Sequence, residues 1–290
     1  MAGICVFGWK ILPDKMRGPG FVIGLGLLAT LKFLGRELQL GQVNLLIILL
    51  LVLMISAFLA GKDAAAGCLW AVSIFIKPYA LVFLPYFAVK KRWKPLVSGA
   101  ITLLAGLALP ALFYGARGNW VVHREWISSL TKSTPDLLAV GDNASLHAFL
   151  LKTLPGTSEF VLKLAWVAAG CAVAALVLWV IWKSNKAAIP GSESLDGALL
   201  LVLIPLFSPL GWYYNYLYAL PAAFILLSAW PLLSRPWKWT LAADLILIGG
   251  SLREILGKTL FRLYTHHSLV AVNFLVLLAV LVHVRDRKIA

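Results

Sequence analysis

The chain has 290 residues, of which 61% are hydrophobic and 13% charged, and its mean hydropathy of +0.89 excludes an ordinary soluble domain. The net charge of +14 could indicate a nucleic-acid partner, but the basic residues lie in short clusters between apolar segments. That distribution is typical of the cytoplasmic loops of membrane proteins, so we expect contact with membrane lipids and none with nucleic acid.

The apolar segments have the length of helices and predict an all-α, polytopic transmembrane helix bundle in one domain, residues 1–290. The first 15 residues lack the basic start and the cleavage site of a signal peptide and resemble the last turns of a helix. With the early basic residues placed in the cytoplasm, about ten membrane helices are predicted, at Phe21–Leu34, Val43–Ala60, Ala64–Ile76, Tyr79–Val89, Ser98–Tyr114, Phe160–Trp182, Leu195–Phe207, Tyr213–Leu233, Thr240–Gly250 and Ser268–Val284.

Lys77 and Pro78 interrupt an apolar run, Ala64–Val89, that would otherwise be one membrane helix. A lysine at bilayer depth costs about 2.5–3.5 kcal/mol, and a proline removes a backbone donor. Either Lys77 reaches a nearby membrane surface from a kinked helix, or Lys-Pro is the tip of a hairpin of two short helices. We favour the hairpin because the short inner turns are then rich in Lys and Arg, and because it places Lys77 outside, within reach of a phosphate.

The segment 115–157 is expected to be an extracytoplasmic loop with interfacial helices. It is too long for a simple connection. Apolar residues recur at helical spacing in 119–130 and again in 143–154, which predicts two helices lying on the membrane surface. Turn-forming residues at 133–136 predict a break between them, and Asn143 is the expected N-cap of the second helix.

Polar residues of the expected outer side gather in four places, and together they predict an active site at the membrane interface. They are Gln42 with Asn44; Lys77; the loop residues Arg124, Glu125, Asn143, Ser145 and His147; and Ser208 with Trp212 and Tyr213.

These residue types suit the transfer of a group from a lipid-phosphate donor. Such a reaction needs positive charge on the leaving phosphate and a carboxylate for the acceptor's proton. Lys77, Arg124 and His147 could supply the charge. Glu125 is the candidate carboxylate, although a lone acidic residue in a loop is more often solvated surface. Motifs for metal or nucleotide binding are missing from the sequence, so no metal or cofactor is expected.

Trp212, Tyr213 and Asp244 can also be explained by a structural role. Trp212 and Tyr213 could form a sugar platform or belong to an aromatic belt at the membrane interface. Asp244 lies inside a predicted helix, where a carboxylate is expected to pair helices.

Four motifs, taken in order, resemble glycosyltransferase family 87, polytopic bacterial enzymes of the GT-C type. They are GQVN, AAAGCLWAVSIFIKPYALVFLPYF followed by KKRWK, GDNASLHAFLLK, and SPLGWYYNY, and the similarity covers about residues 21–230. It implies mannosyltransferase-like transfer from a polyprenyl-phosphate donor on the extracytoplasmic face of the inner membrane. It also implies a site lined by Gln42, Asn44, Lys77, Asn143, Ser145 and the segment Ser208–Trp212, whereas Tyr213–Asn215 departs from many relatives.

The front of the chain departs from the resemblance. GT-C enzymes generally carry their catalytic carboxylate in the first outer loop, and nothing before Phe21 can be that loop, so the chain is expected to lack the first span or spans. It would then be a truncated gene product, a fragment or a non-catalytic descendant. The sequence favours a membrane hexosyltransferase with an unknown acceptor glycan or glycolipid. A lipid or small-solute transporter and a non-catalytic membrane partner are the alternatives.

Overall fold

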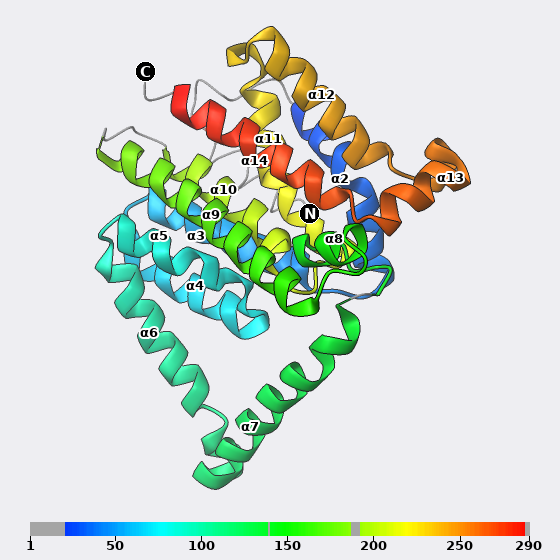
Figure 1. Cartoon of the computed structure of the whole chain (residues 1–290). Coiled ribbons are helices and arrows are strands. Elements are labelled where there is room, and N and C mark those ends of the chain that lie inside the picture. The colour runs from blue at the N-terminus through cyan, green and yellow to red at the C-terminus, as the bar shows by residue number, and fades with distance from the viewer. Residues whose placement is uncertain (1–20, 139, 187–191, 288–290) are drawn as a thin grey trace.

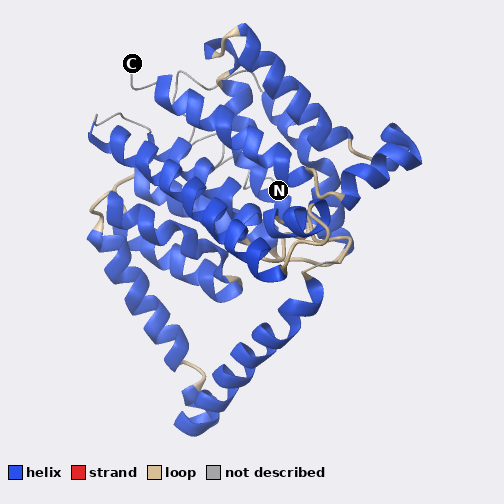
Figure 2. Cartoon of the chain, in the orientation of Figure 1, coloured by secondary structure: helices blue, strands red, loops and turns tan. Residues whose placement is uncertain are grey.

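The computed structural model describes residues 21–138, 140–186 and 192–287. Residues 1–20, where the sequence resembles the last turns of a helix, lie outside these ranges. The described residues form α-helices, short 3-10 helices and loops, and they contain an isolated β-bridge between Asn143 and Trp212 but no strand (Figure 2). The predicted all-α fold is confirmed.

Most helices follow the predicted apolar segments to within a few residues, because apolar runs bounded by Gly, Pro or basic clusters mark helix ends well. Two predictions are wrong: the segment Ser98–Tyr114 breaks and bends after Ala108, and Tyr213–Leu233 is divided into three shorter helices. In chain order they are α2 (Phe21–Gln39), α3 (Asn44–Leu59), α4 (Asp63–Ile76), η2 (Pro78–Phe83), α5 (Leu84–Val89), α6 (Trp93–Ala108), α7 (Ala111–Leu137), α8 (Leu146–Thr153), α9 (Glu159–Lys186), α10 (Ser192–Phe207), η3 (Tyr213–Ala219), α11 (Leu220–Ser228), η4 (Trp230–Leu232), α12 (Arg235–Gly250), α13 (Arg253–His266) and α14 (Val270–Arg287).

The predicted ten membrane crossings are not confirmed. Among the described residues, α9 alone is long and apolar enough to cross a bilayer, and the bent pairs α6 with α7 and α13 with α14 would raise the number to three if each pair is one span. Helices α3 and α10 have 16 residues and α4 has 14. At 1.5 Å per residue they reach about 24 Å or less, against about 30 Å for the hydrocarbon core.

Helix α10 runs through the centre of the bundle, and nearly all of its residues are buried. It packs against α9, α11, α14 and η3 (Figure 1), as expected for a helix that is apolar on every side. Helix α4 lies between α3 and α6. A Cβ atom on Gly67 would lie 2.2 Å from the backbone oxygen of Pro95, so glycine is what allows α4 and α6 to approach so closely.

Two buried carboxylates join helices across the core. Asp196 of α10 lies 2.9 Å from Lys90 Nζ at the end of α5 and 2.9 Å from Arg285 Nε of α14. All three side chains are almost fully buried, so the charges compensate one another where water does not reach. Asp244 of α12 accepts a hydrogen bond of 2.6 Å from Asn273 Nδ2 of α14, which confirms that Asp244 pairs helices.

Helices α6 and α7 form an arm that projects from the bundle (Figure 1). They meet at 89°, and Gly115 (φ 67°, ψ 170°) breaks the first turn of α7, a conformation available almost only to glycine. The expected turn at residues 133–136 is wrong, because α7 continues to Leu137 and those residues mark its last turn. Whether residues 115–157 face the extracytoplasmic side stays a prediction.

Candidate functional site

Lys77 lies between two helices, as the hairpin prediction requires. Helix α4 ends at Ile76, Lys77 is extended (φ −150°, ψ 138°), and Pro78 begins η2. Proline disfavours the helical conformation in the residue before it, which explains why α4 stops there. The break between two short helices is therefore confirmed, while the side of the membrane on which Lys77 lies is not tested.

The Lys77 ammonium is held by the turn between α2 and α3. Its Nζ atom donates to Gln42 Oε1 at 3.1 Å and to Asn44 Oδ1 at 3.2 Å. The rings of Tyr79 and Tyr214 lie 5.6 and 5.2 Å from Nζ, within the range of a cation–π interaction. An ammonium has three N–H donors and two are used by the amide oxygens, so one is left for a ligand.

Glu37 of α2 supports this arrangement, and the sequence analysis missed it. Its carboxylate is fully buried and accepts from Asn44 Nδ2 at 2.8 Å and from the Leu45 backbone N–H at 3.1 Å, so it caps the start of α3 from outside that helix. Tyr218 donates to Asn44 Oδ1 at 3.3 Å. We call Glu37, Gln42, Asn44, Lys77, Tyr79, Tyr214 and Tyr218 the Lys77 cluster.

A helical pattern in the sequence could have identified Glu37. Val22, Ala29 and Phe33 are buried on one face of α2, and Glu37 follows Phe33 by four residues, which places it on that same face. A charged residue close to a turn is usually solvated, but the partners that satisfy this carboxylate come from the next helix.

Asn143 and Ser145 hold the backbone of the segment 208–212. The Asn143 side chain accepts from the N–H groups of Ser145 (3.1 Å) and Gly211 (2.9 Å) and donates to the carbonyls of Leu138 (2.9 Å) and Pro209 (3.0 Å). Ser145 Oγ also donates to Pro209 O at 3.1 Å.

Ser145, and not Asn143, is the N-cap of α8, since its Oγ accepts from the Ala148 N–H. The predicted capping role of Asn143 is wrong because its oxygen already accepts from Ser145 and Gly211. Asn143 and Ser145 are both fully buried. Their described contacts are to backbone, so they position the segment 208–212 and do not themselves present polar atoms to a ligand.

The segment 208–215 reaches the Lys77 cluster through Asn215. Asn215 Nδ2 donates to Tyr79 Oη at 3.3 Å and to Leu210 O at 3.1 Å. Ser208 is nearly buried and donates to Leu210 O at 2.9 Å, whereas Trp212 and Tyr213 are partly exposed. All four predicted places are therefore linked, the loop through the contacts of Asn143 and Ser145 with residues 209–212.

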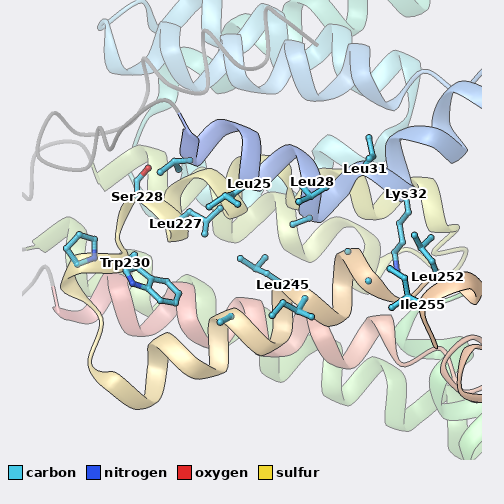
Figure 3. A pocket seen from close by; sticks show the side chains of 17 residues that line it. Leu25, Leu28, Leu31, Lys32, Leu227, Ser228, Trp230, Leu245, Leu252 and Ile255 are labelled. Carbon is cyan, nitrogen blue, oxygen red and sulfur yellow. The ribbon is translucent and has the colours of Figure 1, made fainter. Parts of the chain in front are cut away.

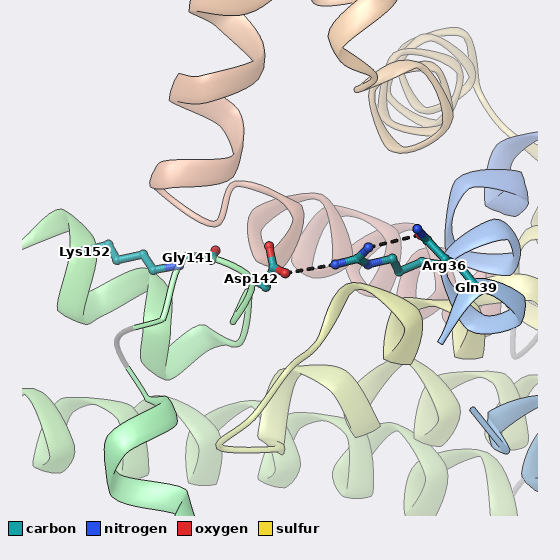
Figure 4. A network of polar contacts seen from close by, with 5 residues as sticks. All are labelled: Arg36, Gln39, Gly141, Asp142 and Lys152. Carbon is teal, nitrogen blue, oxygen red and sulfur yellow. Dashed lines mark hydrogen bonds and ion pairs between the residues drawn. The ribbon is translucent and has the colours of Figure 1, made fainter. Parts of the chain in front are cut away.

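Charged contacts tie the loop before α8 to the same end of the bundle. Arg36 Nη2 at the end of α2 pairs with Asp142 Oδ2 at 3.1 Å, and Lys152 of α8 donates to Gly141 O at 3.1 Å (Figure 4). Lys152 also donates to Ser268 Oγ at 3.0 Å, which joins this loop to the start of α14. Burial lowers the pKa of Lys152 from its ordinary value, and the Asp142 carboxylate partly opposes that shift.

Three predicted residues lie apart from these contacts. Arg124 and Glu125 are exposed on α7, in the arm that leaves the bundle. His147 is 4% exposed, and its ring stacks on Trp166 of α9 with 4.9 Å between ring centroids. Burial lowers the pKa of His147 from its ordinary value; the Glu159 carboxylate partly opposes that shift, and the Lys163 ammonium adds to it. A buried neutral imidazole offers a phosphate no positive charge.

The fold and the Lys77 cluster define a membrane-associated helical protein with a cation fixed among amide and phenol side chains. The sequence profile of glycosyltransferase family 87 matches residues 2–209, and the chain belongs to that family. The match contains all of the predicted site residues up to Ser208, and Trp212 and Tyr213 lie just beyond its end. No curated protein and no solved structure matches the chain.

Proposed function

We propose that this protein transfers a hexose, with mannose as the expected sugar, from a polyprenyl-phosphate donor to an acceptor glycan or glycolipid on the outer side of a bacterial inner membrane. Membership of glycosyltransferase family 87 supports sugar transfer in general. The observation that carries the finer proposal is the Lys77 ammonium, which the Gln42 and Asn44 amide oxygens hold at 3.1 and 3.2 Å at the tip of a break between two apolar helices.

The chemistry assigned to Lys77 is stabilisation of the leaving phosphate. When the bond between the sugar C1 and the phosphate oxygen breaks, that bond's electron pair stays on the phosphate, and a fixed cation lowers the energy of the charge that develops there. The acceptor hydroxyl forms the new bond to C1 from the opposite face, and its proton passes to water. Glu37 is not assigned as the base, because its side chain is fully buried and its described partners belong to the start of α3.

The test uses the full chain in liposomes with polyprenyl-phosphate mannose and a lipid extract as acceptor. We expect Lys77→Met to lower the transfer rate about 100-fold or more, while Lys77→Arg keeps part of the rate. Lys62→Met is the matched control, because Lys62 is exposed at the other end of α4, and it should transfer at the wild-type rate.

Three results would change the proposal. Wild-type transfer by Lys77→Met would remove Lys77 from the mechanism. If the chain transferred sugar from a nucleotide sugar and not from the lipid donor, the proposed class of donor would be wrong. If the wild-type chain bound the donor but transferred no sugar, the transporter and the non-catalytic membrane partner would become the better descriptions.

A further inference from the structure

A groove of about 800 Å³ lies between α2 and α12. Leu25 and Leu28 of α2 form one wall and Leu245 of α12 faces them, with Trp230 near one end and Lys32 near the other (Figure 3). Several lining side chains, among them Leu28 (63% exposed) and Ile246 (70% exposed), reach the molecular surface. The groove is therefore open along its flank and lined by hydrocarbon.

Lys32 alone is charged among the described residues that line this groove. Its Nζ donates to Ser251 Oγ and lies 4.9 Å from the ring centroid of Phe33 and 5.4 Å from that of Tyr264. None of the ion pairs found in the described part of the chain includes Lys32. A cation among apolar groups without a counter-charge is costly, so a bound anion would stabilise the charged form of Lys32.

The groove is separate from the Lys77 cluster. Lys32 and Glu37 are five residues apart on α2, which places their side chains about 140° apart around the helix axis. Glu37 faces Asn44 of α3, whereas Lys32 faces Ser251 after α12. From Val22 to Lys32 the groove follows α2 for about 15 Å, which is long enough to cover a stretch of hydrocarbon chain and still end at a cation.

We propose that this groove binds an anionic phospholipid, with one acyl chain between α2 and α12 and the phosphate on Lys32. The apolar walls match the chain, and the ammonium with the Ser251 hydroxyl matches the phosphate oxygens. The position away from the Lys77 cluster favours a bilayer lipid over the sugar donor. The site goes beyond the proposed transfer reaction and stands without it.

The test measures binding of phosphatidylglycerol and of phosphatidylcholine with identical acyl chains to the purified full chain in detergent, by native mass spectrometry. We expect at least 10-fold tighter binding of phosphatidylglycerol. Lys32→Met should bring the two lipids within about 2-fold, and Lys32→Arg should keep the preference. Lys258→Met, a lysine of α13 that is exposed and does not line the groove, should change nothing.

A second pair of variants tests the groove itself and does not depend on the stability of Lys32→Met. Ala242→Phe places a ring in the groove and should weaken both lipids, whereas Ala243→Phe, its exposed neighbour on the same helix, should weaken neither. Equal binding of the two lipids by the wild type, or an unchanged preference in Lys32→Met, would overturn the proposal.

Two other occupants would also overturn it. Displacement of phosphatidylglycerol by an equal or lower concentration of polyprenyl phosphate would assign the groove to a donor-type lipid. A photo-crosslinking residue at Leu28 that reacts with residues 1–20 of the chain, and not with lipid, would assign the groove to that segment.

Discussion

Asn143 shows how one buried amide can hold a whole site segment. Both its oxygen and its nitrogen make two hydrogen bonds, and all four partners are backbone groups, three of them at Leu138, Pro209 and Gly211. The fourth is the Ser145 N–H. Any substitution that loses half of these bonds leaves buried backbone groups without a partner, which costs more than the bonds contribute in water.

Asn143→Asp is therefore expected to destabilise the protein by about 1–3 kcal/mol or more, because the Leu138 carbonyl loses the Asn143 donor while Pro209 keeps that of Ser145. The carboxylate can still accept from Gly211 and Ser145 but cannot donate to Leu138 or Pro209, and it adds a buried charge. Thermal unfolding in detergent measures the effect. Gln39→Glu makes the same change on an exposed side chain and should unfold close to the wild type, whereas equal unfolding temperatures for the two variants would contradict the role of Asn143.

At this scale the sequence allowed part of the site to be predicted. Gln42, Asn44 and Lys77 were selected for their chemistry, and the structure joins them by hydrogen bonds. Asn143 was selected as a lining residue, yet its polar atoms contact backbone. That difference depends on the backbone of Pro209 and Gly211, far along the chain, and local sequence carries no information about it.

Among the elements, α5, α10 and α14 meet at the triad Lys90–Asp196–Arg285. Asp196→Asn removes the negative charge between two buried cations, and breaking a buried pair in this way typically costs 3–5 kcal/mol. We expect a large drop in the unfolding temperature. The control is Asp286→Asn, because Asp286 pairs with Lys183 at 2.7 Å but both side chains are about half exposed, and such pairs contribute about 0–1 kcal/mol. Similar drops in the unfolding temperature of both variants would show that the triad contributes no more to stability than the exposed pair does.

Helix positions were predictable because hydropathy and breaker residues are local signals, whereas bends were harder to place. Pro78 was recognised as a break because proline restricts its own neighbours. Gly115 was taken only as the start of a loop, although its positive φ kinks α7 after the first turn of that helix. A glycine in the sequence indicates that many backbone conformations are allowed, but it does not indicate which of them the tertiary structure selects.

For the whole molecule, the charge pattern predicts an orientation in the membrane. The basic cluster at residues 90–94 and the segment 115–157 are expected on opposite sides. In the structure, Arg36 at the end of α2 pairs with Asp142 in the loop before α8. That end of α2 leads into the Gln42–Asn44 turn. The Lys77 cluster and the loop should therefore lie on the same side.

Cysteine labelling in whole cells tests this orientation. In a chain whose three cysteines are replaced by serine, Val140→Cys should react with a membrane-impermeant maleimide on intact cells, because Val140 is 41% exposed in the loop. Lys94→Cys, also exposed, should react only after the membrane is permeabilised. The reverse pattern would place the Lys77 cluster in the cytoplasm, where an outward-facing lipid-linked donor could not reach it. Labelling of both positions on intact cells would mean that residues 94 and 140 share one side, and the segment between them would then form a re-entrant arm.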